Sequence, residues 1–556
     1  CIRGNAMVAP STLLTQARVI VTALERILDS ALKRARHITQ DGKAIDDWQV
    51  HCERLAYRAT ELRAIQDTLR YVDALRMHGQ DETLVGMMAL AYAAEVGQKM
   101  VAEVDAHLSD YGLTETFTQQ TLATPQVRQA IRAGTSDALV IDIGRAILDT
   151  GGMNTCWLGD EMAEMTRQSV RDFARQEIEP IAERIHRNDE LSPDDLIRKM
   201  GELGFFAMSI PEAYGGTGMG YLVMIMTTEE LSRASLGAAG SLITRPEIVA
   251  KALLDGGTEM QKQRWLPPIA SGELMVAVSV TEPDTGSDVA SLTCRAEAGA
   301  LEGQRGYFID GAKAWCTFAG RGDIIGLLAR TDPDPSRGAR GLSLFIVEKP
   351  RFYDRDFNLQ QPHGGAMRGK ADATLGYRGM HSFTIQYDKF FVPAENLVGE
   401  GQGLNRGFYL QMSGFANGRL QTGGRALGLS QAALEKSVAY TKSRAQFGRP
   451  ISNYQLTQYK LGRMATHLTV ARQLTYAAAR TMEQAPDMGL EAAMAKLLAS
   501  DVAVWLTQEG QLLHGGWGYA EETPISRYVV DALVLPIFEG VKPILELKVI
   551  ARQLLR

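Results

Sequence analysis

Glu539 is an acidic residue whose apolar setting in the sequence is compatible with proton transfer. It follows the apolar run Val534–Phe538 and precedes Gly540. A carboxylate in a dry pocket has a raised pKa, which makes it a stronger base near neutral pH. The alternative is a glutamate at a helix N-terminus, where the macrodipole stabilises its charge, and residue type alone favours that role. The residue type leaves both interpretations open.

Two arginines are candidates for binding anionic groups of a ligand. Arg444 offers forked donors that suit phosphate, although a surface helix charge would look the same in the sequence. Arg245 could bind a carboxylate of a ligand, because burying such a group requires a positive partner. The alternative for Arg245 is an ion pair with Glu247 or Glu212.

Length and composition predict a globular protein of several domains. The chain has 556 residues, is 45% hydrophobic and 22% charged, and carries a net charge of -6. Such a length exceeds one hydrophobic core and predicts two to four domains. The acidic balance gives no reason to expect nucleic acid or an anionic membrane as a partner. The sequence also lacks an apolar run long enough to predict a membrane span.

The cysteines indicate a reducing compartment. Cys1, Cys52, Cys156, Cys294 and Cys316 are scattered, and none forms a close pair with metal-ligand spacing. An odd number of cysteines fits no closed disulfide set, so we expect a cytoplasmic protein without a metal site. The first residues lack the basic-then-apolar layout of a signal peptide.

The order of elements along the chain is helical, helical, β and helical. Residues 1–155 and 156–275 carry apolar residues at helical spacing, 276–398 show short alternating runs that predict a barrel-like β domain, and 399–556 predict a helical bundle. The expected helices are Thr12–Ile38, Ile45–Met77, Glu82–Leu108, Glu161–Ile185, Asp194–Leu203, Thr227–Leu236, Leu404–Thr441, Tyr454–Glu483 and Leu490–Leu513. The expected strands are Met275–Val280, Gly306–Ile309, Ile324–Ala329, Leu342–Val347 and Phe383–Phe391.

An internal echo links the first helical region to the last. The segment Gly144–Gly152 resembles Gly510–Gly516, and both close a helical series with a pair of glycines. The first 155 residues are therefore predicted to be a diverged copy of the last helical domain. Chance is the alternative, because glycine after a helix is common C-cap chemistry.

Residues 156–556 resemble the acyl-CoA dehydrogenase family in the order and spacing of its motifs. The matching segments are Pro211–Gly218, Val280–Asp288, Gly311–Thr317, Val392–Gly399, Arg444–Gly448 and Phe538–Gly540. The resemblance implies an α+β, mainly α fold with a helical domain (156–275), a central β-barrel domain (276–398) and a C-terminal four-helix bundle domain (399–556). The extra helical region, 1–155, has a counterpart in some members of the family.

The resemblance implies an FAD-dependent dehydrogenase that makes a double bond next to an acyl-CoA thioester. Glu539 stands where the family has its catalytic glutamate, which removes the α-proton while the flavin accepts the β-hydrogen as hydride. The thioester oxygen is held by the backbone N–H of that glutamate and by a flavin hydroxyl. Electrons then pass to electron-transferring flavoprotein, and the enzyme is a homodimer or homotetramer.

Flavin contacts are implied at two groups of positions. Trp315 and Thr317 lie two residues apart on a predicted strand and so share one face, where the family covers the flavin ring; a core aromatic is the alternative for Trp315. Ser287 would touch phosphate, or would be a simple turn serine. The remaining implied flavin contacts are Val280, Thr281, Gly286, Arg444, Phe447, Gln455, Gln511, Gly515 and Gly516, with Arg444 and Phe447 contributed to a neighbouring subunit.

The predicted substrate is a short, branched acyl-CoA with a second carboxylate. Some relatives place the base just before an arginine in the first helix of the last domain, but here Gly418 precedes Arg419, so Glu539 has no rival. We expect Arg245 to bind the distal carboxylate, with help from Thr244. The other substrate contacts expected from the resemblance are Ser287, Arg419, Phe538 and Gly540.

Several positions depart from the family pattern. Leu512 replaces a glutamine ahead of the glycine pair, Val541 replaces a threonine after Glu539-Gly540, and Ala416 replaces an aspartate. Residues 352–371 are extra within the β domain and are expected to form a surface loop, with a lid or a CoA contact as the alternative. The N-terminal helices are expected to cap the core and narrow the acyl pocket.

Two other functions stay open. An acyl-CoA oxidase also carries extra helical segments, and a flavin-carrying, nucleic-acid-binding relative shares the fold. The acidic composition disfavours the second of these.

Overall fold

The computed structural model describes residues 10–154, 156–484 and 489–556. Cys1 and the first residues, where no signal-peptide layout is predicted, lie outside these ranges. The chain forms two compact units. The first comprises Cys1–Glu164, Leu429–Thr481 and Gly489–Arg556, and the second comprises Met165–Gly428 and Met482–Met488.

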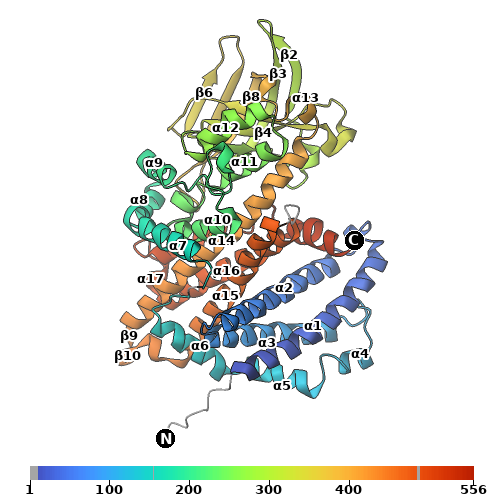
Figure 1. The fold of residues 1–556 in the computed structure, drawn as a ribbon, viewed down its shortest axis with the longest axis vertical. Helices are drawn as coiled ribbons and strands as arrows, with labels where there is room; N and C mark the ends of the chain where they lie inside the picture. Colours follow the sequence, from blue (N-terminus) through green and yellow to red (C-terminus); the bar gives the residue numbers. More distant parts are fainter. Residues whose placement is uncertain (1–9, 155, 485–488) are drawn as a thin grey trace. The chain divides into compact units, whose positions relative to one another are not determined.

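The first unit begins with the predicted N-terminal helices. The long helices α1, α2 and α3 lie side by side, and α3 also packs against α5 and α6 (Figure 1). Their inner faces are aliphatic, as the helical spacing of apolar residues requires. The elements of this region are α1 (Pro10–Thr39), α2 (Gln49–Met77), α3 (Thr83–Ala106), α4 (Glu115–Gln119), α5 (Pro125–Gly134) and α6 (Asp137–Asp149).

The C-terminal helices complete the first unit. Helix α16 (Gly489–His514) is buried over most of its length and packs against α18 and the π-helical segment η9, which also contacts α2. Glycines permit a close approach of α6 to α15, because a Cβ on Gly144 would stand 1.8 Å from the Gln458 carbonyl oxygen. The other elements are α15 (Gln455–Gln484), α17 (Gly516–Tyr519), α18 (Pro524–Ala532), α19 (Lys542–Ile544), η9 (Leu545–Ala551) and α20 (Arg552–Leu554).

The second unit contains the other predicted helical region and the start of a long helix. A capping box begins α12, where Thr258 and Gln261 satisfy each other's backbone N–H groups. Helix α14 (Gly407–Ser443) starts in this unit and ends in the first, so the chain passes between the units within one helix. The other helices are α7 (Glu161–Phe173), α8 (Glu179–Asn188), α9 (Asp194–Glu202), α10 (Gly220–Ala234), α11 (Thr244–Gly256), α12 (Glu259–Ala270) and α13 (Glu400–Gly403).

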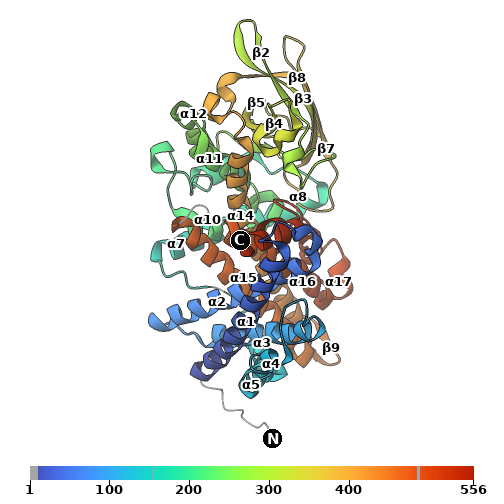
Figure 2. The same ribbon diagram turned by 90° about the vertical axis from the view of Figure 1, so that its right-hand side faces the viewer.

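The β domain is one eight-stranded mixed sheet (Figure 2). Its hydrogen-bonded path runs β1-β4-β2-β3-β8-β7-β6, and β5 pairs with β4. Aliphatic and aromatic side chains from β3, β4, β5 and β8 form its core. The strands are β1 (Val276–Ser279), β2 (Arg295–Leu301), β3 (Gln304–Thr317), β4 (Ile324–Arg330), β5 (Leu342–Glu348), β6 (Asp356–Gln360), β7 (Ala366–Asp372) and β8 (Ser382–Pro393).

The surface loop expected at 352–371 is wrong. This segment contains β6 and most of β7, which pair as an antiparallel hairpin with Phe357 opposite Gly369. The alternation that marks a strand is present, since Phe357 and Leu359 turn inward between polar residues. Strand β2 was also not predicted, because Ala296 is its only buried residue and its burial does not alternate strictly along the strand.

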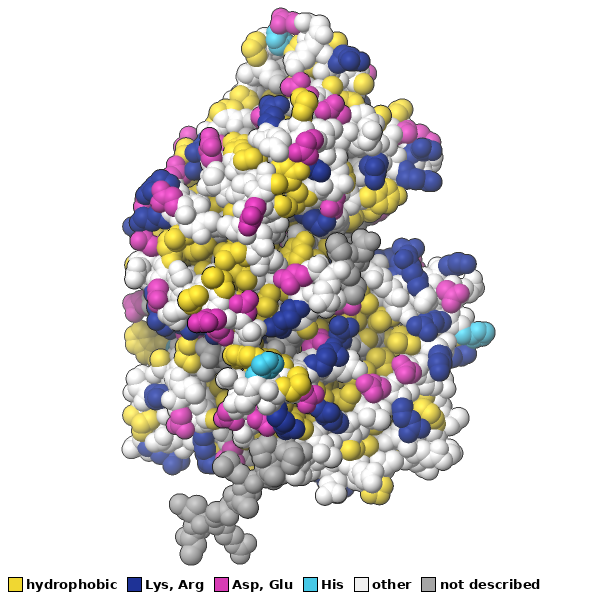
Figure 3. Space-filling model, viewed as in Figure 1, with side chains coloured by type: hydrophobic (Ala, Val, Ile, Leu, Met, Phe, Trp, Pro, Cys, Tyr) yellow, Lys and Arg dark blue, Asp and Glu magenta, His cyan; other side chains and the backbone are white. Residues whose placement is uncertain are grey.

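Several features of the described residues relate to the sequence predictions about membranes, charge, cysteines and metals. None of the helices in this part of the chain has the length and apolar character that crossing a membrane demands. Basic and acidic side chains are interspersed over the face in Figure 3. Cys52, Cys294 and Cys316 are buried free thiols, and Cys156 is also buried. No cluster of potential metal ligands occurs within the described ranges.

Candidate active site

Glu539 lies in a tight loop of the first unit, between α18 and α19. The backbone N–H of Lys542 donates to the carbonyl of Pro536 at 2.9 Å, which closes the loop around Glu539. Glu539 is half-buried, and its φ of 51° falls in the left-handed region. A non-glycine residue held in this region stores strain of about 1–3 kcal/mol, and such strain gathers at functional sites. Helix α19 starts only at Lys542, so Glu539 is not on a helix N-terminus.

Lys496 holds this loop from inside the unit. It lies on α16, is 1% exposed, and its ammonium group donates to the carbonyl oxygens of Phe538 and Gly540. These two carbonyls flank Glu539 on either side. The sequence interpretation missed Lys496, although a lone lysine within the buried segment Glu491–Ser500 was a signal that could have found it.

The apolar flanks of Glu539 surround it only in part. Leu535 is buried, but Ile537 is exposed and Phe538 is half-buried. Gly540 has a φ of 103°, a conformation that side chains rarely adopt. The loop therefore presents the carboxylate at a partly open surface of this unit.

Trp315 is an exposed aromatic residue near the end of β3, in the second unit. It is 61% exposed and has a φ of 59°, and the pairing of β3 with β8 shifts register between Lys313 and Cys316. The bulge turns the indole outward, so Trp315 is not the core aromatic of the alternative interpretation. Thr317 is half-buried and its hydroxyl lies 2.9 Å from the Ser382 hydroxyl. A large exposed ring next to hydroxyl groups suits contact with a flat ligand.

The Val280–Asp288 segment is anchored by a buried ion pair. Lys313 donates to the Val280 carbonyl at 2.8 Å and to the Glu282 carboxylate at 3.0 Å. Glu282 also accepts bonds from the Thr293 and Cys294 backbone N–H groups, each at 2.8 Å. Burial alone would raise the pKa of Glu282, but Lys313 and these donors hold it below its usual value. Sequence analysis did not single out Glu282 or Lys313.

The predicted flavin contacts of this segment lie beside that anchor. Val280 is buried, and the Thr281 carbonyl accepts from the Ala314 N–H at 2.8 Å, which ties the segment to β3. Gly286 and Ser287 are exposed in the loop that follows. The ion pair fixes the start of the loop while leaving these two residues accessible.

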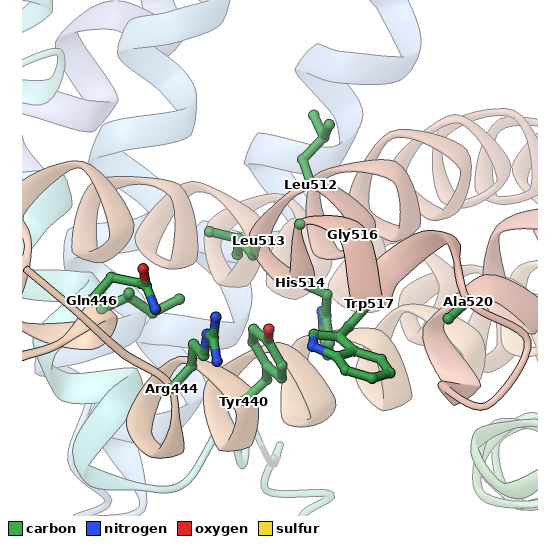
Figure 4. Close-up of a pocket in the computed structure, with 11 residues that line it drawn as sticks. Tyr440, Arg444, Gln446, Leu512, Leu513, His514, Gly516, Trp517 and Ala520 are labelled. Atoms are coloured by element: carbon green, nitrogen blue, oxygen red, sulfur yellow. The ribbon is translucent and has the colours of Figure 1, made fainter.

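A pocket of about 610 Å³ in the first unit brings together several predicted flavin-binding residues (Figure 4). Arg444, at the end of α14, faces the turn between α16 and α17 that carries the glycine pair. No heavy atom stands within 4 Å of a Cβ built on Gly515 or Gly516, so a ligand can approach the backbone closely there. The residues that line the pocket are Tyr440, Arg444, Gln446, Ile451, Leu512, Leu513, His514, Gly515, Gly516, Trp517 and Ala520.

Three other predicted flavin contacts do not line this pocket. Phe447 is 95% exposed at the tip of the hairpin β9–β10 (Ala445–Gln446 and Arg449–Pro450), and Gln455 is exposed at the start of α15. The Gln511 amide donates to the Gly518 carbonyl at 3.1 Å, so it is engaged within its own turn. Leu512, where the family pattern has glutamine, lines the pocket instead.

Arg245 is a buried cation in α11 of the second unit. It is 7% exposed and donates to the Ser241 carbonyl and the Tyr377 hydroxyl, both at 2.8 Å. Neither Glu247 nor Glu212 pairs with it, and no other carboxylate of the described residues does. Glu247 accepts from Ser209 instead, and burial raises the pKa of Glu247 to about 7.

Groups around Arg245 include a second buried arginine and an unsatisfied hydroxyl. Arg425 donates to the Tyr377 hydroxyl at 3.2 Å, so two guanidinium groups converge on one phenol. The Thr244 hydroxyl is fully buried and has no hydrogen-bond partner within the described ranges. Arg419, the other predicted cationic contact, is half-buried on α14.

Models of known protein families match most of the chain. Three family models match: the acyl-CoA dehydrogenase N-terminal domain at residues 160–273, the middle domain at 277–390, and the C-terminal domain at both 8–148 and 405–555. The double match supports the internal echo between the first and last helical regions.

Similar proteins agree with these models. (2S)-Methylsuccinyl-CoA dehydrogenase of Cereibacter sphaeroides is 38% identical over 559 residues, with 98% of each chain covered. Butyryl-CoA dehydrogenase of Megasphaera elsdenii superposes with a TM-score of 0.65 at 30% identity, over 71% of this chain and 99% of that one. A glutaryl-coenzyme A dehydrogenase in complex with glutaryl-CoA gives a TM-score of 0.63 at 29% identity, over 69% and 93%. The chain belongs to the acyl-CoA dehydrogenase family, whose members are flavoproteins.

Proposed function

We propose that this enzyme is an FAD-dependent dehydrogenase of a short, branched dicarboxylic acyl-CoA, with (2S)-methylsuccinyl-CoA as substrate and mesaconyl-CoA as product. The observation that carries the proposal is Arg245, a buried guanidinium with no carboxylate partner among the described residues. The reaction would place the enzyme in the ethylmalonyl-CoA pathway.

A substrate carboxylate would complete the surroundings of Arg245. Burying a guanidinium costs several kcal/mol, and two neutral acceptors offset this cost only in part. The methylsuccinyl group carries a carboxylate beyond the reacting carbons, and it would supply the missing opposite charge. The unsatisfied Thr244 hydroxyl could donate to the same carboxylate. The relative that is 38% identical over nearly the whole chain acts, by its name, on such a substrate.

The residues present fit FAD. Exposed Trp315 offers a flat apolar surface for a ring, and Thr281, Thr317 and the loop with Gly286 and Ser287 offer polar groups beside it. Open space over the Gly515 and Gly516 backbone, with Arg444 facing it, suits a pyrophosphate. Val280, Gln455 and Gln511 are proposed as further contacts. When bound, FAD supplies the acceptor for the β-hydrogen.

Glu539 acts as the base in this proposal. Its carboxylate removes the α-proton of the thioester, and its backbone N–H donates to the thioester oxygen as negative charge develops there. Lys496 fixes the Phe538 and Gly540 carbonyls on either side of Glu539, which holds the backbone that carries this N–H. Phe538, Gly540, Ser287 and Arg419 are proposed substrate contacts.

The proposal includes two protein partners. Phe447 is an almost fully exposed aromatic at a hairpin tip, which is typical of an anchor for another chain. We assign it and Arg444 to the flavin site of a neighbouring subunit in a homodimer or homotetramer. Electron-transferring flavoprotein is the proposed electron acceptor, and the compartment is the cytoplasm.

Bleaching of the bound flavin under anaerobic conditions tests the substrate. Methylsuccinyl-CoA should bleach it fastest in a panel that includes butyryl-CoA, isovaleryl-CoA and glutaryl-CoA. The Arg245→Ala variant should lose about 100-fold in kcat/KM on methylsuccinyl-CoA and little on butyryl-CoA, because only the first needs a counter-charge. Flavin content should not change.

A matched control uses another buried arginine. Arg321 is 3% exposed but pairs with Asp194, so Arg321→Ala removes a buried guanidinium without touching the proposed site. It should not discriminate between the two substrates. Equal losses on both substrates for Arg245→Ala would reject the carboxylate role. Oxygen consumption with peroxide release would show an oxidase instead.

A further inference from the structure

A side chain of the N-terminal helices contacts residues that hold the loop carrying Glu539. Tyr57 lies on α2, and its hydroxyl donates to the Asp501 carboxylate of α16 at 2.9 Å. The same carboxylate oxygen accepts from the Lys542 ammonium group at 2.5 Å. The Lys542 nitrogen also lies 4.9 Å from the centre of the Tyr57 ring. All three residues belong to the first unit.

Lys542 is the residue that ends the Glu539 loop. Its backbone N–H closes the loop on Pro536, and its side chain is fixed by Asp501 and Tyr57. Although burial alone would lower the pKa of Lys542, the neighbouring Asp501 carboxylate holds it above its usual value, so the ammonium stays charged. A charged side chain with two fixed partners restrains the backbone to which it is attached.

The loop is thus held at two points by one helix. Lys496 and Asp501 both lie on α16; Lys496 binds the middle of the loop and Asp501 binds its end. The second of these points involves the N-terminal region, through Tyr57. Because Asp501 uses one oxygen for both Tyr57 and Lys542, the phenol also fixes the rotamer in which that oxygen faces Lys542.

We propose that Tyr57 is a positioning residue through which the N-terminal helices set the geometry of the Glu539 loop. The proposal rests on the proposed role of Glu539 as base. It assigns the N-terminal region a part in the reaction that a purely structural bundle would not have. Small displacements of a catalytic group slow a reaction strongly, since an error of 1 Å costs about 100-fold.

The Tyr57→Phe variant tests this inference in the full-length, flavin-loaded enzyme. It keeps the ring against Lys542 and removes only the hydroxyl. We expect flavin reduction by methylsuccinyl-CoA to slow about 10-fold, with KM little changed. Amides of residues 537–542 should exchange hydrogen for deuterium several-fold faster.

A second tyrosine provides a matched control. Tyr111 belongs to the same N-terminal region, and its hydroxyl donates to the Glu103 carboxylate. Tyr111→Phe removes an equivalent phenol–carboxylate bond away from the loop, so it should change neither the reduction rate nor the loop exchange. If both variants behave alike, the Tyr57 contact contributes only stability and the inference is overturned.

Double variants separate this inference from the proposed function. Tyr57→Phe combined with Lys542→Met should be no slower than Lys542→Met alone, because both act through Asp501. Fully additive losses would overturn the inference. Glu539→Gln tests the base itself: if it keeps normal flavin reduction, the proposed function fails. If it abolishes reduction while Tyr57→Phe matches the unaltered enzyme in rate and exchange, only the inference fails.

Discussion

The two regions that match the same domain model, 8–148 and 405–555, use their glycine pairs differently. Just beyond the end of the first region, the Gly152 carbonyl accepts from the Gln431 amide, and a Cβ on Gly152 would stand 2.9 Å from the Glu435 Cα. In the second region, Gly515 and Gly516 have open space above them and line a pocket. The first pair serves helix packing, and the second is left free for a ligand.

The same difference holds for charged groups. In the first region Arg58 pairs with Glu61 and Glu103, and Tyr111 also donates to Glu103, so these groups satisfy one another. In the second region, the Lys496 ammonium group donates to the two backbone carbonyls that flank Glu539, whose backbone is strained. These pairs support the packing of the first region, whereas Lys496 supports a loop of the second. Apart from Tyr57, whose hydroxyl contacts Asp501 of the second region, substitutions in the first region should therefore change stability, whereas those in the second should change rate.

The largest expected effect is that of Glu539→Gln. Removing a general base typically costs about 10²–10⁴-fold, so flavin reduction by the substrate should slow by about 10³-fold. Melting temperature and flavin content should hardly change, because the side chain is half-buried and at a loop surface. Stopped-flow absorbance measures the rate. As the counterpart in the first region, Glu103→Gln should lower the melting temperature and leave the rate per bound flavin unchanged.

Lys496→Met should have the next largest effect on rate. The substitution leaves the Phe538 and Gly540 carbonyls without their buried donor, at a cost of about 1–3 kcal/mol in stability. Because the loop can then relax from its strained conformation, we expect a loss of about 30-fold in kcat. The conservative Lys496→Arg variant should recover part of that loss if a donor is what the loop needs. A rate equal to that of the unaltered enzyme in the Met variant would contradict the positioning role.

Two alanine substitutions compare the glycines directly. A Cβ on Gly144 would meet the Gln458 carbonyl oxygen at 1.8 Å, so Gly144→Ala should destabilise the protein by about 2–3 kcal/mol. Gly516→Ala meets nothing within 4 Å and should change stability by less than about 0.5 kcal/mol. The Gly516 variant should instead release flavin more readily, which fluorescence of free flavin measures. If the Gly144 variant loses flavin at a temperature where it stays folded, the predicted difference between the two glycines is contradicted.

Much of the fold could be predicted because the signals are local. Helices such as α2 and α16 follow the spacing of apolar residues, and their predicted bounds lie within a few residues of those observed. Strand β2 was not predicted because it buries only Ala296 and lacks a run of alternating large apolar residues. The hairpin β6–β7 shows the alternation of a strand in β6, but it is short and lies in a segment rich in glycine and charged residues, which favours a loop.

The candidate site could be predicted only where a side chain itself bears the chemistry. Glu539 and Arg245 are residue types that can act on a ligand, and it was their positions relative to the family pattern that made them candidates. Lys496, Tyr57 and Asp501 make contacts between segments far apart in the chain. Lys496 is marked locally only as a lone lysine in an apolar stretch, and nothing local marks Tyr57 or Asp501. The bulge that exposes Trp315 likewise depends on its pairing with β8, which the sequence of β3 does not contain.

The smallest expected effect concerns a carboxyl group where the two regions meet. Burial raises the pKa of Glu546 to about 7 against the pull of Lys542, and the nearby charge of Glu53, from the first region, raises it further. The folded protein therefore holds this proton at a pH where the unfolded chain has released it. The contribution of Glu546 to stability is full below about pH 4.5, falls as the pH rises toward about 7, and is constant above that.

Glu546→Gln removes this pH-dependent loss of stability. Between pH 5.5 and pH 8, the melting temperature of the variant should therefore fall by about 1–2 °C less than that of the unaltered protein. Other groups that titrate in this window, such as Glu247, cancel in the difference. Glu53→Gln should act in the same direction but more weakly, since it removes only one of the causes. Identical pH dependence in all three proteins would mean that the two regions are not electrostatically coupled here. A clear difference would show that the first region tunes the second through charge as well as through packing.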